Sequence, residues 1–183
     1  MKYVIAIDVG IQNLGLCVCD VSTTPPTICV WKRCTLCASD SFYSRDLVEH
    51  IHAFIASYDA YFHDAERILI EQQMRVNMRV VEAVIHALFF KETLVIHART
   101  IKAHFQLSTK NYKNNKAAAV QFVTQLLDAS IPQSSYFLHY DAAALHVWNS
   151  EVKKDDLADA LLMILYFLAT YKGTWGDIMH KTT

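Results

Sequence analysis

Lys153-Lys154-Asp155-Asp156-Leu157-Ala158-Asp159 stands at the start of an apolar run that covers residues 157–169. Its three carboxylates repel one another at neutral pH, so folding them together requires a cation or strong hydrogen-bond donors among them. Asp156 and Asp159 are three residues apart, which places both on one face of a first helical turn, where the helix dipole also favours negative charge. The stretch therefore predicts half of a metal site.

Two acids far away in the sequence can supply the other half. The apolar run 3–7 is typical of a buried strand and ends on Asp8, and a short run at 67–70 ends on Glu71. If the two strands are neighbours, their acids lie at one edge of the sheet, where sites of such sheets collect. Oxygen ligands without His or Cys suit Mg²⁺ or Mn²⁺, with two ions in one site. The predicted ligands are Asp8, Glu71, Asp156 and Asp159.

Each acid, taken singly, also has an ordinary explanation. An Asp at a strand end is most often a turn or cap residue, and Glu71 could pair with Arg75. Lys153 and Lys154 could neutralise the acids that follow them on a solvated helix start. The joint occurrence of acids at two strand ends and one helix start favours the metal site.

Hydrophobic periodicity predicts the remaining elements. Strands at 14–21 and 28–36 follow the first strand after short turns, which indicates an antiparallel meander. The order β-β-β-α-β-α-β-α-α predicts an α/β fold with a mixed sheet and helices on its faces. The other expected elements are an amphipathic helix within 41–62, a helix from an Asn77 N-cap to about Lys91, a strand at 93–97, a helix from near Lys116 to about Ala129, an ambiguous segment at 136–149, and a last helix that opens at Asp155 or Asp156.

Composition limits the class of protein. The chain has 183 residues, 53% of them hydrophobic, with three prolines and four glycines, which fits one compact domain over 1–183. The net charge of -1 gives no global signal for nucleic acid. However, no acid occurs between Glu92 and Asp128. The basic residues of that segment are Arg99, Lys102, Lys110, Lys113 and Lys116, and they fit either a surface that contacts nucleic-acid phosphates or a merely solvated face.

The N-terminus and the cysteines bear on location. No signal or transit character precedes the first strand, and 157–169 is shorter than the roughly 20 residues of a membrane span, so we expect an intracellular protein with a buried core helix there and no membrane partner. Five cysteines, all within the first 37 residues, argue against a disulfide framework and for a reducing compartment. Cys17, Cys19, Cys34 and Cys37 could bind zinc, although alternation in a strand favours buried thiols for the first two.

At this point four motifs carry a resemblance that spans nearly the whole chain. They occur in the order Val4-Ile5-Ala6-Ile7-Asp8-Val9-Gly10-Ile11-Gln12-Asn13-Leu14-Gly15, Ile68-Leu69-Ile70-Glu71-Gln72-Gln73, Lys116-Ala117-Ala118-Ala119-Val120-Gln121-Phe122-Val123 and Lys153-Lys154-Asp155-Asp156-Leu157-Ala158-Asp159. Together they resemble the RuvC-type Holliday-junction resolvases, and most closely their poxviral and mitochondrial branch.

The resemblance implies a ribonuclease H-like fold of five strands and a homodimer that cuts two opposed strands of a four-way DNA junction in recombination and repair. Asp8, Glu71, Asp156 and Asp159 match the family's metal-binding acids, with Asp155 as the alternative to Asp156. Lys116 matches its active-site lysine, ahead of Lys113 and Lys110, and the helix from Asn77 matches its dimer helix. We expect phosphate contacts from Arg75, Lys110, Lys113, Lys153 and Lys154. A viral replication site, the nucleus, the cytoplasm and the mitochondrion all remain open as locations.

Three other functions compete with this one. A related nuclease that acts on RNA or DNA flaps would use the same acids. A catalytically silent DNA-binding protein would not need all four of them. An actin-like kinase or ATPase also opens with Asp-x-Gly, but it needs a second domain to close on its nucleotide and 183 residues leave little room for one. We therefore expect no nucleotide cofactor.

Overall fold

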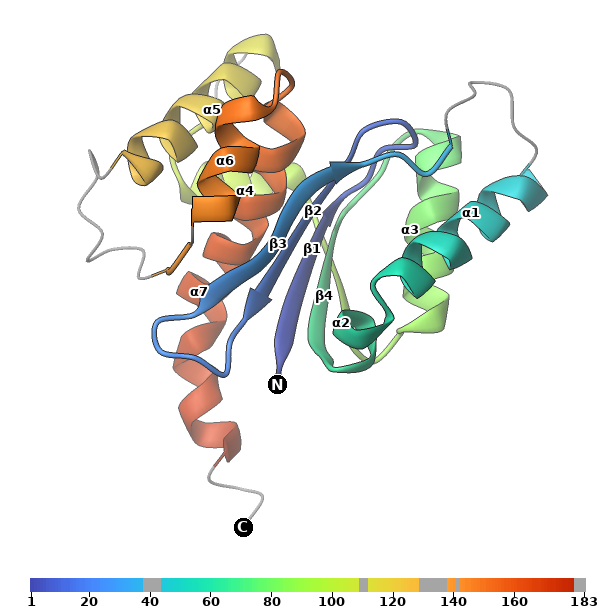
Figure 1. Cartoon of the computed structure of the whole chain (residues 1–183), viewed down its shortest axis with the longest axis horizontal. Coiled ribbons are helices and arrows are strands. Elements are labelled where there is room, and N and C mark those ends of the chain that lie inside the picture. The colour runs from blue at the N-terminus through green and yellow to red at the C-terminus, as the bar shows by residue number, and fades with distance from the viewer. Residues whose placement is uncertain (38–43, 109–111, 129–137, 141, 180–183) are drawn as a thin grey trace.

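A five-stranded mixed sheet lies at the centre of the structure (Figure 1). The structure is a computed structural model, and it describes residues 1–37, 44–108, 112–128, 138–140 and 142–179. The strands stand in the order β3-β2-β1-β4-β5. Their bounds are β1 (Tyr3–Asp8), β2 (Leu14–Asp20), β3 (Thr27–Cys34), β4 (Ala65–Glu71) and β5 (Thr93–Ile96).

Strand pairing brings the two isolated acids to one edge of the sheet. β1 pairs antiparallel with β2, and β2 with β3, so the predicted meander is confirmed. β1 pairs parallel with β4, and Ile7 lies opposite Ile70. Asp8 and Glu71 are the next residues and the last of their strands, so they lie side by side at this edge of the sheet.

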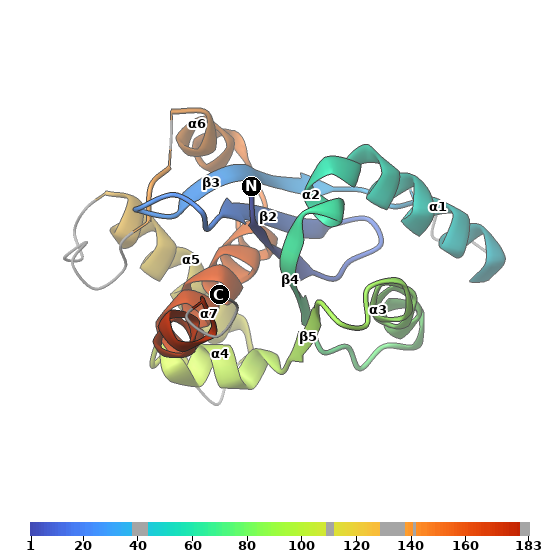
Figure 2. The same ribbon diagram turned by 90° about the horizontal axis from the view of Figure 1, so that it is seen from below.

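Helices cover both faces of the sheet, as the fold class predicts (Figure 2). One face carries α1 (Ser44–Ser57), α2 (Asp59–His63) and α3 (Val76–Leu88). The other carries α4 (Ala98–His104), α5 (Tyr112–Leu127), α6 (Ala142–Ser150) and α7 (Asp155–Met179). The sheet is thus the middle of three layers.

Alternation along the strands decides which face each acid takes. Ile5 and Ile7 pack in the core with α1 and α3, whereas Val4 and Ala6 pack in the core with α7. Side chains alternate with a period of two, so Asp8 belongs to the face of Ala6. The same alternation puts Glu71 on the face of its neighbour Leu69, and both acids therefore face α7.

The predicted helix boundaries need three corrections. The single helix expected within 41–62 is two helices that meet at Tyr58, whose backbone is not helical. Hydrophobic spacing missed the break because both helices bury residues in the same cluster. α3 starts at Val76 with Arg75 as its N-cap, not Asn77, and it ends at Leu88, not Lys91. The ambiguous segment contains α6, and its part at 136–137 lies outside the described residues.

Sequence patterns gave no sign of α4. This short helix is capped by His97, whose ring nitrogen accepts a hydrogen bond from the Arg99 backbone at 3.0 Å. Histidine is not among the usual N-cap residues, so the start of the helix had no recognisable signal. α4 matters because it carries Lys102 toward α7.

The apolar run at 157–169 is a buried core helix, as predicted. Leu157, Leu161 and Leu165 are among its almost wholly buried residues. Within the described part of the chain, none of the helices is both long and apolar enough to cross a bilayer.

The substitution Gly15→Ala tests how closely β2 and α7 approach. A Cβ atom at Gly15 would lie 2.2 Å from the carbonyl oxygen of Asp156, which is a backbone atom and cannot swing aside. We expect a loss of about 1–3 kcal/mol in the free energy of unfolding, the usual cost of forcing extra volume into a packed core. Urea denaturation measures this loss, and an unchanged midpoint would contradict the close approach.

Candidate metal centre

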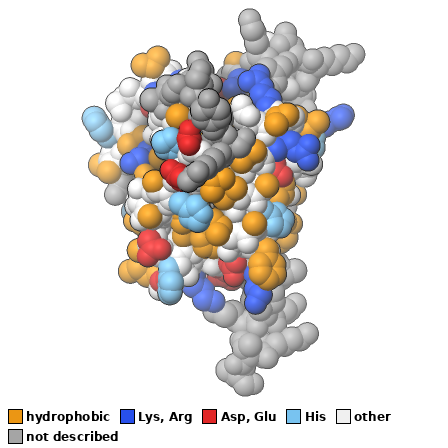
Figure 3. All heavy atoms as spheres, turned by 90° about the vertical axis from the view of Figure 1, so that its right-hand side faces the viewer, with side chains coloured by type: hydrophobic (Ala, Val, Ile, Leu, Met, Phe, Trp, Pro, Cys, Tyr) orange, Lys and Arg blue, Asp and Glu red, His pale blue; other side chains and the backbone are white. Residues whose placement is uncertain are grey.

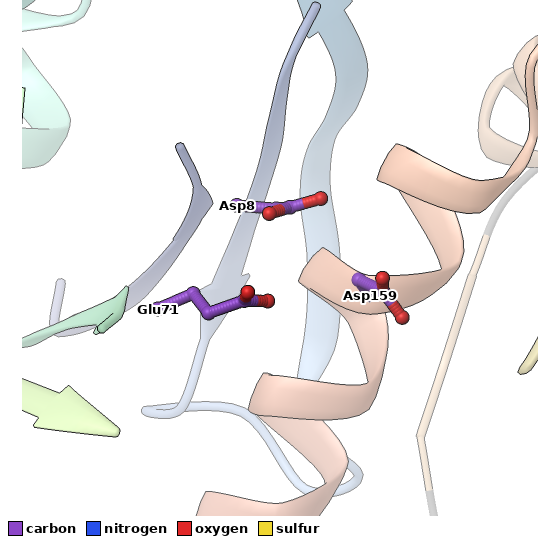
Figure 4. A group of neighbouring side chains, drawn as sticks. All are labelled: Asp8, Glu71 and Asp159. Carbon is purple, nitrogen blue, oxygen red and sulfur yellow. The ribbon is translucent and has the colours of Figure 1, made fainter. Parts of the chain in front are cut away.

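Asp8, Glu71 and Asp159 come together where β1 and β4 end and α7 begins (Figure 4). Each offers one carboxylate oxygen, and the three oxygens lie within 4.8 Å of one another. All three side chains are partly buried. Three acids from distant parts of the chain thus form one group of oxygen ligands, as the sequence predicts for these positions.

Asp156 lies beside this group without belonging to it. Its side chain is buried and lines the same cavity, where it accepts a hydrogen bond from Lys153. Asp155 is directed elsewhere and pairs with Lys116. The cavity is lined by Asp156 and not by Asp155, which favours Asp156 as the further ligand of the two.

Each acid at the head of α7 has a lysine partner. Asp155 pairs with Lys116 and Asp156 with Lys153, while Lys102 donates a hydrogen bond to Asp159 at 2.8 Å. Both members of the last pair are nearly buried, with 11% and 12% of their side chains exposed. Of the two lysines that the sequence offered to neutralise Asp155 and Asp156, Lys153 therefore does so.

Lys102 is the site residue that the sequence prediction missed. It appears there only as one of the basic residues of a segment of unknown structure. The signal that could have found it is the helical character of 98–104, which points one side chain of that segment at α7. That signal was hidden by the unusual histidine cap.

The two acids on the strands lack such partners. Among the described residues, neither Asp8 nor Glu71 forms a salt bridge, so the alternative in which Glu71 pairs with Arg75 does not hold. Burial, together with the charges of Glu71 and Asp159, raises the pKa of Asp8 well above its ordinary value. Burial and the charge of Asp159 raise the pKa of Glu71 to about 7.

The acids of α7 behave differently because their lysines are close. Burial would raise the pKa of Asp155, but the hydrogen bond from Lys116 lowers it below its usual value. The pKa of Asp156 is raised by burial and by the charge of Asp155, against the opposing effect of Lys153. Without a bound cation, the two strand acids therefore hold their protons more readily than ordinary carboxyl groups do.

An open cavity of about 950 Å³ surrounds the acids. Arg75, Lys116 and Lys153 also line this cavity. Two predicted phosphate contacts, Arg75 and Lys153, therefore lie in the same cavity as the predicted active-site lysine, Lys116. The loop after β4 and the start of α3 also line the cavity. Met74 of the loop is 84% exposed, and Val76, the first residue of α3, is 78% exposed. A cavity that holds both a group of acids and the positively charged side chains of Arg75, Lys116 and Lys153 suits a cation together with a ligand that carries phosphate.

The other three predicted phosphate contacts are not among the described residues that line this cavity. The Lys154 ammonium lies 5.2 Å from the centre of the Trp148 ring, outside the cavity lining. Lys110 lies outside the described residues, as does the side chain of Lys113, whose backbone is in α5. The cysteines form no zinc site within the described chain, and none of the five forms a disulfide there.

A hard divalent cation fits the residues present. Three carboxylates within bonding reach of one point are the ligand type that Mg²⁺ and Mn²⁺ prefer. Burial, followed by the charges of neighbouring acids, raises the pKa values of Asp8 and Glu71, so both acids lack a full set of partners that favour their ionised forms. A bound cation would favour the ionised form of both acids.

Comparison with known proteins identifies the family. The family model described as Poxvirus A22 protein matches residues 2–170 of this chain. The chain belongs to the Poxvirus A22 protein family. A search of curated proteins found no match for this A22-family chain.

Solved structures similar to this A22-family chain share its fold at low sequence identity. The fowlpox virus Holliday junction resolvase is 14% identical, with a TM-score of 0.62 over 92% of this chain and 99% of that one. The yeast mitochondrial Holliday junction resolvase Ydc2 is 19% identical, with a TM-score of 0.60 over 94% and 85%. *Thermus thermophilus* RuvC, in complex with a Holliday junction substrate, is 17% identical, with a TM-score of 0.55 over 94% and 96%. The fold is the ribonuclease H-like fold of RuvC, as predicted.

The stability of the metal-free chain should fall as the pH rises from about 4.5 to about 7. Glu71 keeps its proton over this range in the folded chain, while in the unfolded chain it ionises near its ordinary value of 4.5. The unfolded state then binds fewer protons, so its formation becomes easier with rising pH. Urea denaturation at several pH values in a chelator measures the slope.

The isosteric variant Glu71→Gln is the control for this slope, because it removes the titrating group and keeps the shape. Its stability should fall less between these pH values than that of the unmodified chain. Added Mn²⁺ should also reduce the fall, since a cation stabilises the ionised acids. Identical slopes for the two chains in chelator would contradict the raised pKa of Glu71.

Proposed function

We propose that this chain is a metal-dependent endonuclease that resolves four-way DNA junctions by cutting two opposed strands. The observation that carries the proposal is the convergence of Asp8, Glu71 and Asp159 in a cavity that Arg75, Lys116 and Lys153 also line. Membership of the A22 family and a fold shared with proteins described as Holliday junction resolvases support the choice of substrate. We further infer that residues 1–183 form one nuclease domain, since the sheet packs against helices from both halves of the chain.

Asp8, Glu71 and Asp159 would hold Mg²⁺ or Mn²⁺, with Asp156 as the fourth ligand. A pair of such ions supplies an activated water and stabilises the leaving oxygen in phosphodiester hydrolysis. The protein's own part is to hold the carboxylates close together before the substrate arrives. The partial burial of these acids strengthens their attraction for a bound cation.

The lysines supply positive charge to the DNA strand. Lys116 lines the cavity next to the acids and is assigned to stabilise the charge that develops on the reacting phosphate. Arg75 and Lys153 line the same cavity and are assigned to neighbouring phosphates. Lys110, Lys113 and Lys154 remain proposed phosphate contacts.

The protein would act as a homodimer through the outer face of α3. Val76 and Leu88 at the two ends of this helix are exposed, and Phe90 just beyond it is 63% exposed. Val80 and Val84 lie between them at helical spacing and are only partly buried. Figure 3 shows apolar side chains gathered in the middle of this side of the molecule. An exposed apolar patch suits a symmetric contact with a second copy, and a dimer would present two cavities to two opposed strands.

The lack of disulfides among the described residues is compatible with action in a reducing compartment, which we propose to be the site of viral DNA replication. Membership of a poxviral family supports this location.

Cleavage of a four-way junction, compared with a linear duplex, a single strand, a flap and an RNA duplex, tests the substrate. In Mg²⁺ we expect the junction to be cut in two opposed strands and the other substrates to be cut at least about tenfold more slowly. Phosphate attraction alone does not distinguish these substrates, so such a preference would show that the protein recognises the junction itself. Equal rates on the linear duplex would contradict the junction assignment. Faster cleavage of the flap or the RNA duplex would identify a related nuclease instead, and no cleavage of any substrate would favour a silent DNA-binding protein.

Asp8→Asn and Asp159→Asn should each lower cleavage by at least about 10³-fold while junction binding persists. Each change removes a metal ligand and leaves the basic walls of the cavity in place. Gel shift measures binding, and single-turnover assays measure cleavage. The matched control is Asp59→Asn on α2, an exposed acid outside the cavity, which should cleave normally. Loss of binding in parallel with cleavage would count against the assigned role.

The substitutions Val80→Asn and Val84→Asn should each yield a monomeric protein. A polar group in the centre of an apolar contact weakens it because the amide has to give up its hydrogen bonds to water. Light scattering measures the mass. Ala56→Asn places the same amide at an exposed position on α1 and should leave the mass unchanged. A dimeric mass for both valine variants would move the contact to another surface.

A further inference from the structure

β3 contacts the first turn of α7 and the segment just before it, although it contributes no acid to the metal centre. The indole nitrogen of Trp31 donates a hydrogen bond to the carbonyl oxygen of Leu157 at 3.0 Å. Two residues further along, the guanidinium of Arg33 pairs with Glu151 at 3.1 Å. Residues two apart on a strand point to the same face, so one face of β3 holds both ends of this segment.

Glu151 organises the turn that leads into α7. The carboxylate oxygen that pairs with Arg33 also accepts hydrogen bonds from the backbone of Val152 at 3.0 Å and of Lys153 at 3.2 Å. The side chain of Lys153 in turn holds Asp156. A fixed carboxylate therefore sets the path of the chain immediately before the acids of the helix.

The other branch of Arg33 reaches the loop that follows Asp8. Its second terminal nitrogen donates a hydrogen bond to the side-chain oxygen of Asn13 at 2.8 Å, and Asn13 lines the metal cavity. One guanidinium thus joins the loop behind a strand acid to the turn before the helix acids. Its planar, forked donors suit such a bridge between two oxygen acceptors.

Trp31 fixes the first turn of the helix itself. Only 4% of the residue is exposed, and its ring stacks on Trp148 of α6 with 5.2 Å between ring centres and 12° between planes. Leu157, which accepts its hydrogen bond, stands in the sequence between Asp156 and Asp159. A buried indole N–H left without an acceptor would be costly, so the structure favours keeping the Leu157 carbonyl in place. The hydrogen bond therefore opposes a shift of α7 along the sheet.

We propose that Trp31 and Arg33 are positioning residues that set the head of α7 against β1 and β4, so that Asp159 reaches the oxygens of Asp8 and Glu71. This inference rests on the proposed metal site. Reacting groups tolerate little displacement, since an error of about 1 Å in an active site can cost about a hundredfold in rate. Arg33 is not assigned to DNA, because both of its branches already have protein partners.

Calorimetric titration of the full chain with Mn²⁺ tests the proposal in two variants. Trp31→Phe removes the indole donor and keeps an aromatic ring on Trp148, while Arg33→Gln removes the bridge between Asn13 and Glu151. Each should weaken Mn²⁺ binding by about tenfold, the lower end of what groups behind metal ligands contribute. Junction affinity in chelator should remain within twofold of that of the unmodified chain.

Ile51→Val is the matched control. It lies in the core on the opposite face of the sheet, so it lowers stability without touching α7. Its Mn²⁺ affinity should equal that of the unmodified chain, which separates positioning from general loss of stability. Asp8→Asn provides the reference for a lost ligand.

The outcomes distinguish this inference from the proposed function. An unmodified chain that binds no Mn²⁺ would overturn the metal site and the inference with it. Normal Mn²⁺ affinity in Trp31→Phe and Arg33→Gln, with binding intact in the unmodified chain, would overturn the inference alone. Loss of junction affinity in Arg33→Gln with normal Mn²⁺ affinity would make Arg33 a DNA contact. If Arg33→Gln does not fold, Trp31→Phe decides the question.

Discussion

Mutual repulsion among the carboxylates at the end of the sheet is the constraint on which the rest of this structure depends. Parallel pairing of β1 with β4 holds Asp8 beside Glu71, and the buried helix α7 brings Asp159 to both. Such an arrangement is costly without positive charge nearby, and the raised pKa values of the two strand acids express that cost. The fold tolerates it because the apolar packing of α7 against the sheet is extensive.

Positive charge reaches the site from three separate elements. Lys102 comes from α4, Lys116 from α5 and Lys153 from the turn before α7. The helices on this face of the sheet therefore serve the site as well as the core. This arrangement also explains how a chain with a net charge of -1 can bring basic side chains to a cavity that holds the acids, since what matters is where the charges lie and not their overall sum.

α3 connects the cavity with the proposed dimer contact. Its first turn includes Asn77 and Met78, which line the cavity, while Val80 and Val84 lie on the apolar side of the helix. Glu82 of the same helix accepts a hydrogen bond from the backbone of Gln73 at 2.7 Å, in the loop that follows Glu71. The rim of the cavity and the apolar surface are therefore parts of one rigid element.

The sequence alone determined the mixed sheet, the meander and the positions of the acids at two strand ends and a helix start, because hydrophobic periodicity and isolated charges are local signals. Only the tertiary structure decided which lysine faces which acid, since that depends on how α4, α5 and α7 pack together. The involvement of Lys102 and the bridge made by Arg33 were equally invisible, because both join residues far apart in the chain across surfaces that no periodicity describes. Local pattern placed the carboxylates on their elements, and long-range packing chose their partners.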